Sequence, residues 1–365
     1  MIEEFSHRTK EEDEDVLLSA AIEGMFLNTE LFGHQRGASN KGYKRIEYGT
    51  LVLSTQNLHL GNANVNLRFE HGMVSPAYKT YRIKNCSVTL LAEWIKSEKA
   101  KQFFYDATTV GASVCRRNVE WETLYDQTLY LPTHNEQQHI AEFLSLVSER
   151  ILRQEKFIEC LKKYKRGLHD RIFSHLSNSE CEKTDLRSIA TFCGGGTPSK
   201  DVPSYWDGNI GWISSSDIHE EWVDTISVTR RINELAINNS ATKLCPSGTI
   251  AIVSRVGVGK VALMSEDLCT SQDFTNITSI MGNTLFMTYQ IAYKMKIEAA
   301  KTQGTSIKGI TAEEIKSLKI DIPADEEQRY IATLLSSLDI RLRQEKREAD
   351  CLRTLKKALL QQLFI

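Results

Sequence analysis

The chain has 365 residues, of which 41% are hydrophobic and 25% are charged, and its formal net charge is −2. Since one domain usually takes roughly 100–200 residues, this composition predicts two or three globular domains and excludes a largely disordered chain. The near-neutral charge argues against a promiscuous nucleic-acid coat protein but is compatible with a local DNA-binding face.

Neither the apolar runs, the N-terminal residues nor the cysteines of the sequence point to a membrane or to the cell exterior. No stretch approaches the roughly 18 uncharged apolar residues of a membrane span. The start, "MIEEFSHRTKEEDEDV", is acidic where a signal peptide is basic and then apolar. The eight cysteines include no C-x-x-C pair, which favours free thiols in a reducing compartment over a metal site. We therefore expect a cytoplasmic protein.

The elements along the chain form two mixed α/β blocks, each followed by a long helix. Strand-like runs such as "GTLVLST", "GTIAIVSR" and "KIDIP" alternate with turns and with helical stretches such as "TLLAEWIKSEKAKQFFYDA". We expect a first globular domain over 1–134, a helix over 135–176, a second domain over 177–322 and a second helix over 323–365. The expected fold class is α+β, with a pseudo-two-fold internal repeat.

The two helices repeat one another. At an offset of 191 residues Gln137 aligns with Gln328, and apolar heptad positions then coincide along both helices. An offset of 190, suggested by the shared word "RQEK", breaks these layers. The polar residues Gln154 and Glu345 share one a position at 191, which predicts a lock on the register.

Helices of about 40 residues span roughly 60 Å and need a partner for their apolar faces. We expect the two to pair with each other as a coiled coil; the alternative is that each packs on its own globular domain. The blocks also echo each other, because "YGTLVLST" resembles "SGTIAIVS" and both blocks close on a Gly-x-Ser turn, a short helix, a strand and a proline. A repeated scaffold with divergent surfaces suggests two binding modules on one spacer.

Catalytic motifs are missing. "SRVGVGKVA" lacks the glycine and hydroxyl residue of a P-loop, and no H-E-x-x-H, G-x-S-x-G, Pro-Pro or Pro-Asp word occurs. The segment "CGGGTPSK" is interpreted as a flexible turn near a phosphate backbone. We therefore expect a protein that binds and positions, with no catalytic residue and no metal.

One combination of segments is specific. "GGGTPSKDVPSYWDGNIGWISSSDI", "SRVGVGKVALMS", "SQDFTNI", "GTSIKGI" and "IDIPADEEQRYIATLLSSLD", with "YKRIEYGTLVLSTQNLHLGNANV" and "GMVSPAYKTYRI" in the first half, resemble the specificity (S) subunit of type I restriction-modification systems. The likeness covers nearly the whole chain. Block 1 lacks the "GGGTPS" word, so its first domain is either a short variant or a truncated one.

The resemblance implies a non-catalytic reader of double-stranded DNA. Each block would be a target-recognition domain for half of a bipartite sequence. The helices would form an antiparallel coiled coil that sets the gap between the half-sites and holds two methyltransferase (M) subunits. S-adenosylmethionine would be bound by the M subunits, with no cofactor on this chain, and a motor-nuclease (R) subunit would complete the complex. The alternatives are the recognition part of a type IIB or IIG-like system and a coiled-coil adaptor without a nucleic-acid role.

The chemistry of base readout assigns candidate DNA contacts in block 2. Arginine pairs with guanine, glutamine with adenine, and hydroxyl and lysine groups with phosphate. Arg255 follows a strand and precedes a Gly-x-Gly turn; the alternative for it is a salt bridge. Gln272 is a candidate adenine contact or plain turn residue. The remaining block 2 candidates, for which a capping role or a solvated loop is the alternative, are Ser199, Lys200, Ser214, Ser216, Lys260, Ser306 and Lys308.

In block 1 the adjacent Arg116 and Arg117 match the position of "SIKGI" and are the most DNA-like pair. Gln56 and Asn57 follow a strand and either read adenine or make a turn. The Gly-rich segment 34–45 has the composition of a backbone clamp or of a solvated loop. The remaining block 1 candidates are Arg36, Lys41, Tyr43, Lys44, Tyr78 and Lys79.

Overall fold

The computed structural model describes residues 1–34, 39–113, 116–302 and 309–363. The chain divides into two compact units, Met1–Lys156 with Lys346–Ile365 and Phe157–Glu345. Each unit therefore holds one globular domain together with half of each long helix. The predicted four segments describe the order along the chain, whereas packing joins the helix halves to the domains.

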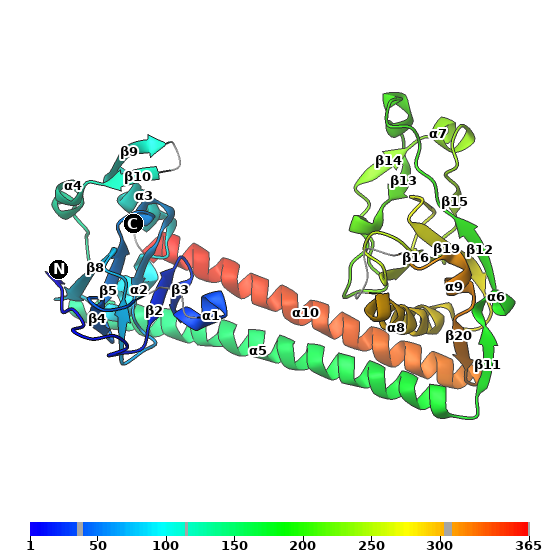
Figure 1. Cartoon of the computed structure of the whole chain (residues 1–365), viewed down its shortest axis with the longest axis horizontal. Helices are drawn as coiled ribbons and strands as arrows, with labels where there is room; N and C mark the ends of the chain where they lie inside the picture. Colours follow the sequence, from blue (N-terminus) through cyan, green and yellow to red (C-terminus); the bar gives the residue numbers. More distant parts are fainter. Residues whose placement is uncertain (35–38, 114–115, 303–308, 364–365) are drawn as a thin grey trace. The chain divides into compact units, whose positions relative to one another are not determined.

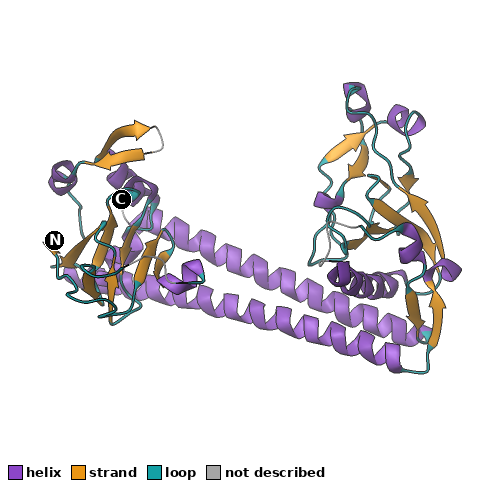
Figure 2. Cartoon of the chain, in the orientation of Figure 1, coloured by secondary structure: helices purple, strands orange, loops and turns teal. Residues whose placement is uncertain are grey.

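Unit 1 contains a four-stranded antiparallel sheet together with several short helices (Figures 1 and 2). The strand order is β1-β8-β5-β6, and two further strand pairs, β2-β3 and β4-β7, and a hairpin, β9-β10, complete it. Buried Leu53, Tyr81 and Trp94 lie in its main core. The elements are β1 Ile2–Phe5, β2 Leu18–Ala21, β3 Gly24–Leu27, α1 Asn28–Phe32, β4 Lys44–Glu47, β5 Leu51–Ser54, β6 Ala63–Val65, β7 His71–Val74, β8 Tyr78–Ile83, α2 Val88–Trp94, α3 Glu98–Asp106, β9 Thr108–Ser113, β10 Arg116–Val119 and α4 Trp121–Asp126.

Unit 2 contains two four-stranded sheets, with orders β12-β19-β16-β17 and β14-β13-β18-β15, and a strand pair β11-β20. The helix α8 contributes buried Phe286 and Tyr289 to the core that also contains Ile252. The elements are β11 Glu182–Asp185, α6 Leu186–Ile189, β12 Ala190–Gly194, β13 Ile210–Ile213, β14 Arg230–Ile232, α7 Glu234–Asn238, β15 Leu244–Cys245, β16 Ile250–Val253, β17 Val261–Leu263, β18 Leu268–Thr270, β19 Phe274–Ile280, α8 Thr284–Thr302, α9 Ala312–Lys316 and β20 Lys319–Ile322.

Unit 1 and unit 2 each contain a four-stranded sheet, and the two sheets have the same strand order. Order β1-β8-β5-β6 in unit 1 matches β12-β19-β16-β17 in unit 2, and all neighbouring pairs are antiparallel. The echoed words "YGTLVLST" and "SGTIAIVS" hold β5 and β16, at an offset of 199 residues. Before these strands Gly49 and Gly248 have φ of 84° and 85°, a left-handed conformation that favours glycine. The repeated letters thus encode a repeated turn and strand.

The long helices are α5 His134–Asn178 and α10 Asp325–Leu363. In unit 1 Leu144, near the start of α5, shares a core with Leu360, near the end of α10. In unit 2 Phe173, near the end of α5, shares a core with Ile331, near the start of α10. A start meets an end in each unit, so the predicted antiparallel pairing is confirmed. Each helix also packs on a globular domain, so the two alternatives raised by the sequence hold together.

The burial of the helices follows the predicted layers. Leu144 on α5 and its counterpart Leu335 on α10 are both fully buried, and the polar Gln154 and Glu345 are 7% and 5% exposed. The a and e positions therefore form the inner face of each helix.

Among the described residues, no helix is both long and apolar enough to cross a membrane.

A glutamine fixes the start of α5 to its domain. The Gln137 side-chain NH2 group donates to the Pro132 carbonyl (2.9 Å), and its Oε1 accepts from the Ser87 backbone N–H (2.8 Å). Ser87 is the N-cap of α2. The glutamine thus ties the first turn of the long helix to the first turn of a domain helix.

The same clamp is built in unit 2. Gln328 donates to the Pro323 carbonyl (2.9 Å) and accepts from the Asn283 backbone N–H (2.8 Å). Asn283 caps the start of α8, since its Oδ1 accepts from the Phe286 N–H. The repeated glutamine at offset 191 therefore has one structural role in both halves.

A partly buried ion pair joins three helices in unit 1. Lys356 on α10 lies 2.7 Å from the Glu93 carboxylate on α2, and the Ser148 hydroxyl on α5 donates to the same carboxylate at 3.2 Å. The side chains of Lys356 and Glu93 are 24% and 15% exposed. The acid of this triad sits on the domain helix.

In unit 2 the acid changes place. Lys165 on α5, the repeat counterpart of Lys356, pairs with Asp339 on α10, the counterpart of Ser148. The Tyr289 hydroxyl on α8 donates to Asp339 at 2.7 Å. Asp339 is fully buried, and this burial raises its pKa while Lys165 opposes the rise. The domain helix supplies the hydroxyl here and the long helix supplies the acid.

The structure corrects parts of the expected block ends. The Gly-x-Ser of block 1 does not form a turn, because Gly111–Ser113 is the end of strand β9. No strand precedes Pro132, whereas β20 precedes Pro323 and pairs with β11. Among the described residues of unit 1, no strand corresponds to β11, so the segment before Pro132 lacks a partner.

Candidate nucleic-acid interface

In both units the same turn lies at the ends of two neighbouring strands of this four-stranded sheet. In unit 2, Val253 at the end of β16 pairs with Phe274 at the start of β19. The next residue, Ser254, donates to the Asp273 carbonyl with both its backbone N–H and its hydroxyl, each at 2.8 Å. The turn is closed by the Asp273 N–H, which donates to the Ser271 hydroxyl (3.3 Å). We call residues 254–256 and 271–274 the turn edge of unit 2.

The turn edge of unit 1 is formed by residues 55–57 and 75–78. Ser54, at the end of β5, pairs with Tyr78 at the start of β8. The Thr55 hydroxyl donates to the Ala77 carbonyl at 2.8 Å, and the Ala77 N–H donates to the Ser75 hydroxyl at 3.3 Å. Both of these hydrogen bonds between side chain and backbone have a counterpart in unit 2.

The residue after the anchoring hydroxyl points to solvent in both units. It is Gln56 in unit 1 and Arg255 in unit 2, at the offset of 199 that aligns β5 with β16. Both side chains are exposed, and neither makes a hydrogen bond or an ion pair with another residue that the structure describes. Two sequence-predicted candidates thus occupy one structural position.

A hollow of about 690 Å³ lies beside the turn edge of unit 2. Its lining brings together Arg255 and Gln272, and Gly309–Ala312 closes another side. The Thr197 hydroxyl donates to Gln272 Oε1, so the amide NH2 group of Gln272 is left to donate outward. The structure therefore gathers an arginine and a glutamine at one concave surface.

The glycine-rich segment beside this hollow is tightly packed. A Cβ on Gly195 would lie 2.0 Å from the Ser271 carbonyl oxygen, and one on Gly196 would lie 2.4 Å from the Ala241 backbone. Gly196 also accepts from the Trp212 indole N–H at 3.0 Å. The expectation of a flexible turn is wrong, because these glycines allow close contact between backbone segments. Ser199 and Lys200 follow at the exposed surface.

The predicted serines after β13 belong to an internal network. Ser214 caps a short 3₁₀ helix, Ser215–Asp217, and its hydroxyl bonds to those of Ser216 (2.9 Å) and the Asp217 carboxylate (2.9 Å). Lys260 donates to the Ser215 and Ile218 carbonyls at 3.4 and 3.3 Å. Ser214 and Lys260 therefore brace the loop, and Ser216 is the exposed member.

Two predicted basic residues of unit 1 are held by the domain itself. The Lys44 ammonium donates to the Tyr78 carbonyl at 2.7 Å, and burial lowers the pKa of Lys44. Lys79 lies 3.0 Å from the Glu4 carboxylate and over the Trp121 ring. Lys44 thus holds the backbone of the turn edge at Tyr78, whereas Lys79 is engaged by an acid and an aromatic ring of its own domain.

The hairpin β9-β10 holds another predicted basic residue. Arg117 donates to the Thr108 hydroxyl and carbonyl at 2.7 Å each and stacks over the Tyr105 ring. Its guanidinium is therefore engaged within the hairpin. The backbone of Arg116 lies in β10, and its side chain is outside the described part of the chain.

The other candidates divide by exposure. Lys41 and Asn57 are exposed, whereas Tyr43 and Tyr78 are half-buried. The Tyr78 hydroxyl donates to the Ala20 carbonyl at 3.3 Å. The candidates that lie outside the described residues are Arg36, Ser306 and Lys308.

Three residues of unit 2 that lie near the predicted contacts were not predicted from the sequence. Arg230 stacks on Trp212 and donates to Ser214 at 2.5 Å. Thr311 and Lys316 line the hollow with Arg255. The spacing of "VTRRIN" gave no hint that Arg230 returns to the loop after β13, because the two strands pair only in the fold.

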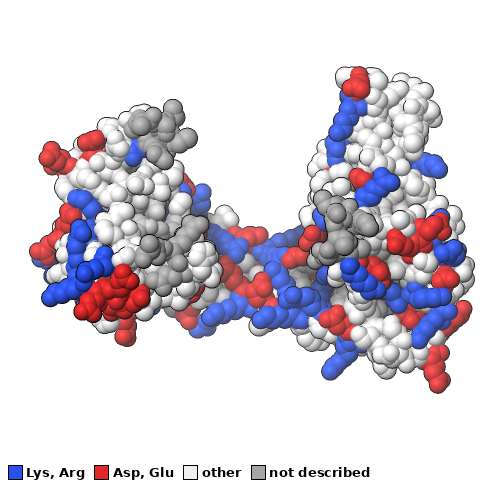
Figure 3. Space-filling view, viewed as in Figure 1, with Lys and Arg blue, Asp and Glu red and all other residues white. Residues whose placement is uncertain are grey.

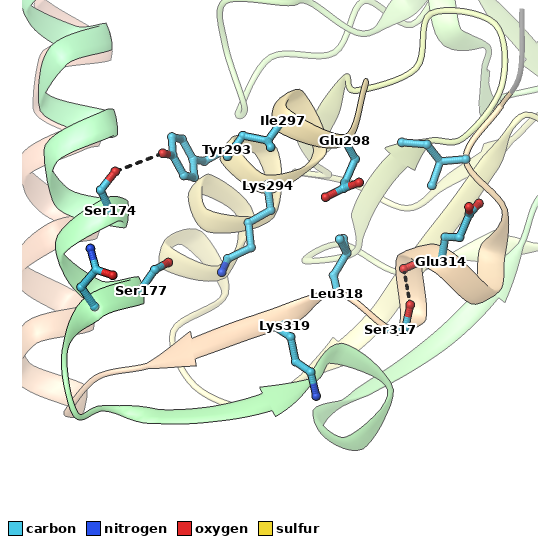
Figure 4. A pocket seen from close by; sticks show the side chains of 12 residues that line it. Ser174, Ser177, Tyr293, Lys294, Ile297, Glu298, Glu314, Ser317, Leu318 and Lys319 are labelled. Carbon is cyan, nitrogen blue, oxygen red and sulfur yellow. Dashed lines mark hydrogen bonds between the residues drawn. The ribbon is translucent and has the colours of Figure 1, made fainter. Parts of the chain in front are cut away.

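A second hollow of unit 2, of about 620 Å³, lies among the end of α5, α8 and α9 (Figure 4). Its lysines are paired: Lys294 lies 2.7 Å from Asp321 and Lys319 lies 3.0 Å from Asp185. Among the residues that the structure describes, no group of three or more His, Cys, Asp or Glu is arranged to hold a metal ion. The lysines of this hollow are therefore engaged in ion pairs, whereas Arg255 at the turn edge has no ion-pair partner among the described residues.

Charge on the surface is mixed. Basic and acidic side chains interleave along α5 and α10, and the domains carry separate blue and red patches (Figure 3). Ion pairs between the helices include Arg150 with Glu348 and Arg353 with Glu155 in unit 1. Such exposed pairs contribute about 0–1 kcal/mol each, so they fix register more than stability.

The comparisons with known proteins agree with this architecture. Residues 178–350 match the family model for the type I restriction modification DNA specificity domain. Just under half of the chain is therefore similar to type I restriction-modification DNA specificity domains. The MjaIX specificity subunit of Methanocaldococcus jannaschii is 31% identical over 187 residues, 49% of this chain and 43% of that protein. The EcoR124I/EcoR124II specificity subunit of Escherichia coli is 32% identical over 186 residues, 49% of this chain and 45% of that protein.

The chain thus matches less than half the length of these two relatives. Solved structures extend the likeness to the whole length of this chain at the level of the fold. A chain from a structure of a type I R-M system has a TM-score of 0.61 at 15% identity, covering 100% of this chain and 97% of that one. The S subunit of M. genitalium has a TM-score of 0.57 at 16% identity, covering 100% and 93%.

Proposed function

We propose that this chain is the DNA sequence-specificity subunit of a type I restriction-modification complex. Each unit reads one half of a bipartite double-stranded DNA target. The chain itself performs no chemistry, and S-adenosylmethionine is bound by partner methyltransferase subunits. The observation that carries the proposal is the turn edge, which is built twice with the same hydrogen bonds and presents a different unpaired polar side chain each time.

The chemistry of the two edges suits DNA. Arginine and glutamine side chains bind base edges in the major groove, and backbone N–H and hydroxyl groups bind phosphate. A protein that only joined two other proteins would have no need for such donors at corresponding sheet edges. The repeated edge therefore favours DNA over a non-nucleic-acid adaptor.

The helices suit partner subunits. Apolar side chains on α5 remain exposed, among them Phe143 (48%), Leu146 (59%) and Tyr164 (58%). Exposed aromatic and aliphatic residues of this kind are enriched at protein interfaces. We propose that they contact two methyltransferase subunits, one for each repeat, and that a motor-nuclease subunit joins through that complex.

Methylome sequencing tests the proposal. The chain is co-expressed with its methyltransferase partner in a host without adenine methylation, and methylated positions are mapped. The expected result is methylated adenine in both halves of one bipartite motif, lost when this chain is omitted. Methylation without a bipartite motif, or methylation unchanged without the chain, would refute the proposal.

A further inference from the structure

We propose that Gln56 and Arg255 are equivalent specificity-determining residues, and that each reads one base pair of its own half-site. Gln56 selects an A·T pair and Arg255 selects a G·C pair. This inference rests on the proposed function and adds to it which side chain reads and which base class each prefers.

The equivalence of the two positions is structural. Gln56 directly follows Thr55, whose hydroxyl is anchored on the Ala77 carbonyl. Arg255 directly follows Ser254, whose hydroxyl is anchored on the Asp273 carbonyl at the same distance, 2.8 Å. Counting from the paired strands β5 and β16 gives the same match.

At positions 56 and 255 hydrogen bonds hold the backbone in place, whereas the side chain forms no hydrogen bond with a described residue. In unit 2 the Ser254 carbonyl also accepts from the Ile310 N–H at 2.8 Å, and a Cβ on Gly309 would lie only 2.6 Å from that carbonyl. In unit 1 the Asn57 N–H donates to the Ser54 hydroxyl at 3.1 Å. The backbone is therefore fixed on both sides of an exposed side chain that has no partner among the described residues.

Geometry of the side chains gives the base preference. A guanidinium donates twice to the O6 and N7 acceptors of guanine, and a carboxamide both accepts from N6 and donates to N7 of adenine. Gln56 keeps both functions, because neither end of its amide is bonded within the described residues. At Gln272 the Thr197 hydroxyl already occupies one acceptor position of the amide oxygen, so Gln272 has less acceptor capacity for adenine readout than Gln56. Gln56 is the better adenine reader of the two.

The experiment exchanges the two side chains in the complete complex. Variants Gln56→Arg, Arg255→Gln, Gln56→Ala and Arg255→Ala are co-expressed with the methyltransferase, and methylomes are sequenced. Binding of the complex to single-base variants of the wild-type motif is measured alongside. Gln102→Arg, on an exposed part of α3, and Arg166→Gln, on an exposed part of α5, serve as charge-matched controls.

The wild-type motif should contain an A·T pair in the first half-site that Gln56→Ala relaxes and Gln56→Arg changes toward G·C. Arg255→Ala and Arg255→Gln should relax one G·C pair in the other half-site only. Discrimination at the affected pair should fall roughly 5- to 150-fold, the range for loss of one bidentate contact. The controls should keep the motif.

Two results would overturn the inference while leaving the proposed function intact: a bipartite motif unchanged in all four variants, or changes at both positions within one half-site. A wild-type complex with no bipartite motif would instead refute the proposed function, and this inference with it. The alanine variants add no new group at these exposed positions, so they report on readout even where the exchanged side chains disturb the turn.

Discussion

The acid of the unit 1 triad should be movable from the domain helix to the long helix. We consider Glu93→Gln, Ser148→Asp and the double variant. Glu93→Gln leaves the Lys356 ammonium against a neutral amide, and Ser148→Asp puts two carboxylates beside one ammonium. The double variant restores one acid and one base, in the arrangement that Asp339 and Lys165 have in unit 2.

The magnitude follows from burial. Breaking a fully buried ion pair costs about 3–5 kcal/mol, and losing an exposed pair costs about 0–1 kcal/mol. Since Lys356 and Glu93 are 24% and 15% exposed, Glu93→Gln should lower the free energy of unfolding by about 1–3 kcal/mol. Ser148→Asp should cost about 1 kcal/mol through the second carboxylate, and the double variant should return to within about 1 kcal/mol of the parent.

Urea unfolding followed by circular dichroism measures these free energies, and hydrogen exchange of peptides from α2 and α3 shows whether unit 1 is affected. The matched control is Asp339→Asn in unit 2, where the acid is fully buried, so a loss of about 3–5 kcal/mol is expected. The opposite outcome is that the two unit 1 substitutions act additively, so that the double variant is less stable than either single variant. That result would refute the reasoning that one acid on either helix is enough to stabilise the Lys356 ammonium.

Three further predictions concern the helices and their surroundings. Gln328→Ala removes both hydrogen bonds of the clamp and should cost about 1–3 kcal/mol, with Gln137→Ala giving a similar loss, measured by urea unfolding; unchanged midpoints would refute the clamp. Burial lowers the pKa of His169 to about 4, so between pH 6.5 and 4 the unfolded chain binds a proton that the folded chain does not. The free energy of unfolding should therefore fall by an amount of order 3 kcal/mol as the pH is lowered from 6.5 to 4. Melting curves over this pH range should show a smaller fall for His169→Phe. Arg343→Ala removes the bidentate pair with Asp224 (2.6 and 2.7 Å) and should raise proteolysis of residues 219–228, whereas equal cleavage in both proteins would contradict that role.

The helical repeat was readable from the sequence because heptad spacing reports the buried face of a helix. Leu144 and Leu335 fall on the predicted e positions, and both are fully buried. The α+β class followed from strand-like runs beside helical stretches, the pairing of the helices from their length and apolar faces, and its antiparallel sense from the resemblance. The clamp formed by Gln137 was hidden, since one of its partners, Ser87, lies 50 residues away.

The candidate site was readable in part. Gln56 and Arg255 were predicted as DNA contacts because both follow a strand and carry base-reading groups, and both side chains are exposed in the structure. Lys44 and Arg117 have equally suitable side chains, yet they turn inward to carbonyl oxygens that the fold brings to them. Composition cannot separate these cases, because the difference lies in which backbone oxygen happens to be nearby. Tight packing of Gly195 was hidden for the same reason.

The hydroxyl anchors at Thr55 and Ser254 have a consequence for how such a chain can change. The hydrogen bonds that shape each turn use backbone atoms and the hydroxyls of neighbouring residues, and none uses the side chain at position 56 or 255. A single codon change at either position can therefore alter the exposed chemical group while the turn keeps its bonds. Mutation can explore new surface chemistry there without first having to rebuild the fold.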